Sequence, residues 1–80
     1  MDKESLALLE DLFEQAAADF AAHGFARVNT QLANPTRERI QHAGEFLLER
    51  AAEKFPNLDP YVSSSSDGTI NLVLGRHKTQ

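Results

Sequence analysis

The chain has no cysteine, so neither disulfide bonds nor thiolate metal sites can supplement its core. Its longest apolar runs are three or four residues, far short of the ~18 that cross a bilayer. No Asn-x-Ser/Thr sequon is present. The acidic start, Met1-Asp2-Lys3-Glu4, continues directly into a helical pattern, which argues against a secretory signal. These absences lead us to expect a soluble, cytoplasmic protein.

Acidic charge is concentrated in the first third of the chain. The net charge is −4; residues 1–25 hold six acids against one lysine, whereas residues 26–80 hold seven bases and six acids. An acidic first helix argues against non-specific nucleic-acid binding by that face. It is compatible with a basic surface on a protein partner.

A long apolar stripe predicts a first helix over residues 3–23. Apolar side chains recur there at the i, i+3, i+4, i+7 spacing of a helix that buries one face. The stripe comprises Leu9, Leu12, Phe13, Ala16 and Phe20. Gly24 suits the left-handed position that ends a helix, and a Schellman cap there would place Phe20 against Phe25.

A second helix is predicted over residues 35–55. Asn34 is a good N-cap and Pro35 a good first helical residue, since proline has no amide hydrogen to leave unpaired. The residue before Pro56 is disfavoured in the helical region, so the helix ends there. Its predicted buried stripe comprises Ile40, Ala43, Gly44, Leu47, Leu48, Ala51 and Phe55.

The pair Asp67-Gly68 predicts a β-hairpin between strands at 61–66 and 69–75. A two-residue loop of this composition favours a type I′ turn, which needs positive φ at both positions. That loop fixes the register. The pairs that would then face the core are Ser65 with Ile70, Ser63 with Leu72 and Tyr61 with Leu74, while Val62 and Val73 would oppose each other on the outer face.

A further strand is indicated at residues 25–32, where apolar and polar side chains alternate, although Ala, Asn and Gln are poor strand formers. With this strand the order is α-β-α-β-β, with a crossover through the second helix in a small mixed sheet. Without it, a β-hairpin covers a helical hairpin. Either arrangement is a single small α+β domain over residues 1–75, followed by a polar tail at 76–80.

Two apolar side chains point away from the stripes of their own helices. On helical wheels, Phe46 falls on a charged side of the second helix that includes His42, and Leu8 falls on a polar side of the first. An exposed phenylalanine on a charged face is a candidate anchor for a protein partner or a homodimer. The alternative is that the other layer of the domain covers it.

The acidic face of the first helix is a second candidate for partner binding. Glu10, Asp11 and Glu14 lie opposite its apolar stripe. Such an array can imitate nucleic-acid phosphates and block a basic groove on another protein. More often it simply keeps a helix solvated.

Four basic residues form an alternative phosphate-binding set: Arg37, Arg39, Arg76 and Lys78. They would meet if the second helix began near the end of the last strand. No aromatic side chain is interleaved with them as a stacking platform, so nucleic-acid binding ranks below protein binding.

No motif in the sequence specifies a chemistry. The three histidines lack metal-ligand spacing, no phosphate-binding glycine loop occurs, and the serine run lacks the surroundings of a nucleophile. We therefore expect no catalytic residue, metal or other cofactor. The expected function is that of a small acidic, non-enzymatic protein-interaction module of regulator, inhibitor or adaptor type, which binds a protein partner or itself. The alternative is a nucleic-acid-binding accessory protein.

Overall fold

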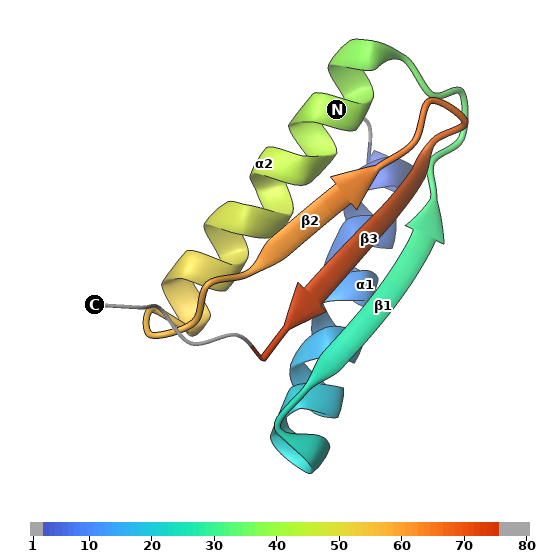
Figure 1. The fold of residues 1–80 in the computed structure, drawn as a ribbon. Coiled ribbons are helices and arrows are strands. Elements are labelled where there is room, and N and C mark those ends of the chain that lie inside the picture. The colour runs from blue at the N-terminus through green and yellow to red at the C-terminus, as the bar shows by residue number, and fades with distance from the viewer. Residues whose placement is uncertain (1–2, 76–80) are drawn as a thin grey trace.

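Two helices cover one face of a three-stranded sheet, and the opposite face carries no helix among residues 3–75, which the structure describes (Figure 1). The structure is a computed structural model. Its elements run in the order α1 (Lys3–His23), β1 (Ala26–Gln31), α2 (Arg37–Lys54), β2 (Tyr61–Ser64) and β3 (Thr69–Leu74). The predicted α+β class, its α-β-α-β-β order and the third strand are confirmed.

The helix α1 begins and ends where its pattern predicts. Gly24, at φ 74°, donates its amide to the carbonyl of Phe20 at 2.7 Å, which is the left-handed cap with a single bond. Phe20 packs on Phe55, not on Phe25 as predicted. The ring of Phe20 meets that of Phe55 edge-on at 5.2 Å, so α1 is fastened to the end of α2, while Phe25 stays 51% exposed.

The helix α2 begins two residues later than predicted. Thr36 is the N-cap, and its hydroxyl accepts a hydrogen bond from the amide of Arg39 at 3.1 Å. Asn34 instead takes a left-handed conformation at φ 50°, which asparagine tolerates better than most residues. The chain therefore turns at Asn34-Pro35 before the helix starts.

The sheet has the strand order β1-β3-β2, and both neighbouring pairs are antiparallel. Because β3 lies between β1 and β2, those two strands point the same way without touching. The sheet is therefore antiparallel, not mixed as predicted. On the inner face, Ile70, Leu72 and Leu74 of the central strand are fully buried beneath the helices.

The hairpin differs from the prediction by one residue. Gly68 donates its amide to the carbonyl of Ser65, and Ser65 donates to Thr69, both at 3.0 Å. Gly68 has φ 96°, and no non-glycine residue of this loop has positive φ. This is a three-residue loop ending in a left-handed glycine, not a two-residue type I′ loop. The pKa of Asp67 is lowered because its carboxylate accepts the amide of Thr69, at 3.0 Å.

The longer loop reverses the faces of β2. Val62 pairs with Leu72 and Ser64 with Ile70, so Val62 points inward, while Tyr61 pairs with Val73 on the outer face. The predicted pairings of Ser65, Ser63 and Tyr61 with core residues are therefore wrong. A slip of one residue turns every side chain of a strand to the opposite face.

The core lies between the helices and the inner face of the sheet. The buried apolar side chains are Leu9, Leu12, Phe13, Ala16, Ala26, Val28, Leu32, Ala43, Leu47, Ala51, Leu58, Ile70, Leu72 and Leu74. Most members of the predicted stripes are here or pack against it. Leu48 is the exception, because its side chain is 41% exposed although it was predicted to be buried.

Candidate functional site

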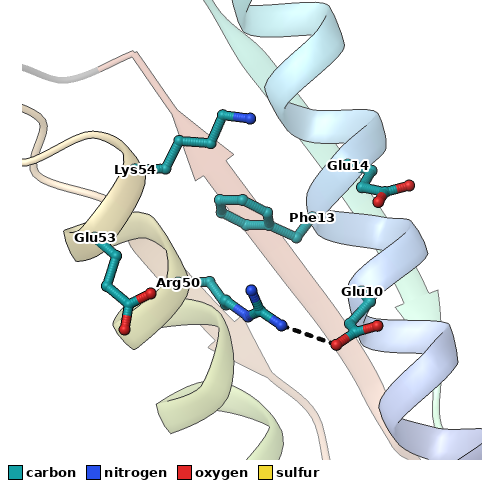
Figure 2. A pocket seen from close by; sticks show the side chains of 6 residues that line it. All are labelled: Glu10, Phe13, Glu14, Arg50, Glu53 and Lys54. Carbon is teal, nitrogen blue, oxygen red and sulfur yellow. Dashed lines mark hydrogen bonds and ion pairs between the residues drawn. The ribbon is translucent and has the colours of Figure 1, made fainter.

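A hollow of about 340 Å³ lies between the two helices and contains two of the predicted acidic residues (Figure 2). Its lining residues are Glu10, Phe13, Glu14, Arg50, Glu53 and Lys54. Glu10 accepts a hydrogen bond from Arg50 at 2.8 Å, and the two side chains are 46% and 45% exposed. An exposed pair of this kind contributes little to stability. The helix α1 supplies Glu10 and Glu14 to this open hollow, and α2 supplies Arg50, Glu53 and Lys54.

The structure partly covers Phe46, which the sequence offered either as an interface anchor or as a side chain covered by the other layer. Its ring is partly buried and packs against the core, and the guanidinium of Arg50 lies 5.2 Å from the ring centroid. Arg50 thus links Phe46 on α2 to Glu10 on α1. Leu8 is likewise partly buried against the core, whereas His42 is exposed on α2. Phe46 is therefore part of the folded monomer rather than a free apolar projection.

The remaining predicted acids line two different surfaces of α1. Asp11 and Leu8 line a second hollow, of about 470 Å³, alongside β1. Glu14 borders both this hollow and the one between the helices. The acidic face is thus continuous around α1, and the structure does not gather it with His42 or Phe46 into one site.

Of the predicted basic set, the structure describes Arg37 and Arg39. The helix α2 begins beside the hairpin loop, because Pro35 lies against Gly68 at the start of β3, whereas the set required proximity to the end of β3. Arg39 is partly buried and donates to the hydroxyl of Ser5 at 2.9 Å. Arg76 and Lys78 lie outside the described residues.

A groove that the sequence did not reveal runs between α2 and β2. Two hollows of about 320 and 390 Å³ share Arg37, Ile40 and Ser64 in their linings. The second is also lined by Gly44, Leu48 and Val62. We call this surface the edge groove. The sequence did not predict this groove, because Leu48 fits the buried stripe of the second helix and Val62 was predicted to lie on the outer face of the sheet.

The outer face of the sheet is a further surface that the sequence misassigned. Tyr61, Val73 and Arg27 form one row across the three strands, since Val73 pairs with both of the others. Phe25 lies at the end of the same face, one position before β1, and is 51% exposed; Tyr61 is 52% exposed. The register of β2 brings Tyr61 to this face.

Within residues 3–75, no cluster of three or more histidine, aspartate or glutamate side chains could hold a metal ion. No helix in the same range is long and apolar enough to cross a membrane. Comparisons with family models, curated proteins and solved structures find no match to this chain. Among the described residues, exposed large apolar side chains include Leu48 at the edge groove and Phe25 and Tyr61 on the outer sheet face.

Proposed function

We propose that this chain is a non-enzymatic protein-interaction module of the cytoplasm that pairs with a second copy of itself along the free edge of β2. The observation that carries the proposal is Leu48, a large apolar side chain 41% exposed beside an edge strand. No strand in the described part of the chain pairs with the outer edge of β2. An open edge is a template for another strand, and strand addition is a common mode of recognition.

The edge groove has the charge pattern of a surface that can bind its own copy. Arg37 and Glu45 are both exposed, and each lies four residues from Gln41 along α2. Antiparallel pairing of two β2 strands would set the two α2 helices antiparallel. A two-fold axis near Gln41 would bring Arg37 of each copy toward Glu45 of the other, as an isologous interface requires.

The same axis gives Leu48 an apolar partner. Leu48 is seven residues beyond Gln41, so it would lie level with the start of the other copy's α2. Pro35, which lies next to that level, lines the hollow of about 320 Å³, and Ile40, one residue from the axis, lines the same hollow. Burial of about 1,600 Å² in total is typical of a stable interface. A domain of this size has a small core and gains stability from such burial.

Sedimentation velocity over a hundredfold concentration range tests the proposal. The wild-type chain is expected to form dimers. Leu48→Lys should give a folded monomer, because the substitution places a charge in the buried interface. The matched control is Leu6→Lys, which alters another exposed leucine, 36% exposed on α1 and outside the edge groove.

A charge exchange tests the two-fold arrangement itself. Arg37→Glu alone and Glu45→Arg alone should each weaken the dimer, because each places like charges together across the axis. The double variant Arg37→Glu/Glu45→Arg should restore it. A chain that stays monomeric at every concentration would overturn the proposal. So would a dimer that survives Leu48→Lys but not Leu6→Lys.

A further inference from the structure

The outer sheet face combines two exposed aromatic rings with a cation, and the three strands contain no carboxylate. Phe25 and Tyr61, 51% and 52% exposed, are the most exposed of the large hydrophobic side chains in the described chain. The three strands contain one charged residue, Arg27, and it lies in the row with Tyr61. The acids of the helices belong to the opposite layer.

Phe25 lies against the backbone at Gly75 although half of its surface is exposed. Continuation of the β1–β3 register sets it opposite Gly75. A side chain at Gly75 would meet the Phe25 ring, because an added Cβ would lie 2.8 Å from its Cδ2 atom. The Phe25 ring can therefore lie close to the backbone at Gly75, because glycine has no side chain, and half of its surface faces solvent. A preplaced ring loses little conformational freedom when a ligand stacks on it.

We propose that the aromatic end of this face binds single-stranded nucleic acid, with Phe25 and Tyr61 as stacking surfaces and Arg27 as a phosphate contact. Sheet-borne aromatic rings that stack two or three unpaired bases are a recurrent mode of RNA recognition. Phe25 lies next to β1 and Tyr61 lies on β2, and β3 separates these two strands. Because neighbouring strands lie about 4.8 Å apart, the two rings are spaced more widely than the bases of a continuous stack. Each ring therefore takes a separate base.

Polar side chains beyond the rings suit unpaired base edges. Asn29, Asn71 and Ser63 form the next row across the strands. Amides and hydroxyls both donate and accept hydrogen bonds. A duplex does not fit this chemistry, since its bases are stacked on each other and cannot reach the rings.

The charge distribution directs a polyanion to this face. The acidic helix α1 repels phosphates, and α2 carries equal numbers of acidic and basic residues. Among charged residues, the strands carry only Arg27. In the sequence, Arg76-His77-Lys78 follow Gly75 directly. With one cation among the described residues of the patch, binding should be moderate, and most of its free energy should come from stacking.

The chain itself contains the reporter for the experiment, because Tyr61 is its only tyrosine and it has no tryptophan. Unlabelled 12-residue oligouridylate and oligothymidylate are titrated into the full chain. Stacking of a base on Tyr61 should quench its fluorescence. Anisotropy of fluorescein-labelled versions of the same oligonucleotides gives the Kd and follows variants that lack tyrosine.

Variants assign the contacts. Tyr61→Ala should weaken binding about fivefold to a hundredfold, the range that corresponds to loss of one stacked base. Tyr61→Phe should retain most of the affinity, because it keeps the ring. Arg27→Ala should reduce the slope of log K against log salt by about 0.7, the value for one phosphate on a single strand. Lys3→Ala, which removes an exposed cation on α1, is the control and should leave that slope unchanged.

The test separates this proposal from self-association. The Leu48→Lys monomer should still bind the oligonucleotide, because Leu48 belongs to α2 and not to the outer sheet face. Absence of quenching and of anisotropy change at low salt would overturn the proposal. Equal binding by wild type and Tyr61→Ala would also overturn it. Preference for oligouridylate over oligothymidylate would support it and identify RNA as the ligand.

Discussion

The two faces of the sheet are built from the same three strands but have opposite characters. On the inner face, Leu72 is fully buried between Val28 and Val62 of the neighbouring strands. On the outer face, one residue further along β3, Val73 lies between Arg27 and the half-exposed Tyr61. Alternation along a strand creates both faces, but only the inner one receives the helices. The register of β2 therefore decides which of its side chains stabilise the fold and which are free to bind.

The largest expected effect is loss of packing on the inner face. Leu72→Ala should reduce the free energy of unfolding by about 2–5 kcal/mol, because it leaves a cavity at the centre of the core. Asn71→Ala, the preceding residue on the outer face, should change it by less than about 1 kcal/mol. Urea denaturation measures both. Similar losses for the two variants would contradict the division into an inner and an outer face.

The turn that sets the register should be the next most sensitive point. Gly68→Ala places a side chain at φ 96°, with its Cβ 2.9 Å from that of Pro35. Gly24→Ala, at φ 74°, has no neighbouring atom within 4 Å and so tests backbone strain alone. Strain of this kind costs about 1–3 kcal/mol. Thermal melts should show a larger loss at Gly68; equal losses would mean that Pro35 does not restrict the turn.

The register itself is tested by moving one charge across adjacent residues of β2. Val62→Lys should destabilise the protein by about 1–3 kcal/mol, because Val62 packs against the core near Gly44. Tyr61→Lys should be milder, since that side chain lies half-exposed on the outer face. Chemical denaturation compares the two. A larger loss for Tyr61→Lys than for Val62→Lys would contradict the observed register and favour the one predicted from the Asp67-Gly68 pair.

The smallest effect concerns the pH dependence of the hairpin loop. The amide of Thr69 lowers the pKa of Asp67 because it hydrogen-bonds to the charged carboxylate. The folded state therefore favours the ionised form. Its stabilising contribution is present at neutral pH and is lost as the pH falls through the lowered pKa.

Melting temperatures of wild type and Asp67→Asn should therefore converge as the solution becomes acidic. Asp59→Asn, which alters an exposed aspartate before β2, is the control. If the gap between wild type and Asp67→Asn stays the same at acid and neutral pH, the bond to Thr69 does not stabilise the charged carboxylate.

Local patterns in the sequence predicted the elements well. The helix α1 ends where Gly24 supplies a left-handed residue, and β3 alternates so regularly that its buried residues follow directly. The start of α2 was harder, because Asn34 and Thr36 are both good N-caps. In the structure Pro35 lies against Gly68, and Thr36, the residue after it, is the N-cap.

The candidate surfaces were predicted less well, for a related reason. Helical wheels place Leu48 in the apolar stripe and Phe46 outside it. In the structure, Phe46 packs against the core, with Arg50 from the next turn over its ring, and Leu48 stays 41% exposed at the edge groove. A helix that packs on both a sheet and another helix buries a wide part of its surface. The periodicity of its apolar residues alone does not show which side chains that part includes.

The sequence alone determined the secondary structure and the inner face of β3, because helix caps and strand alternation are local properties. The tertiary structure decided the loop length at Gly68, and with it the face on which Tyr61 lies. It also decided which apolar side chain of α2 remains exposed, because a sheet of three strands ends at β2. Register and coverage depend on residues far apart in the chain, and these long-range contacts determine both proposed binding surfaces.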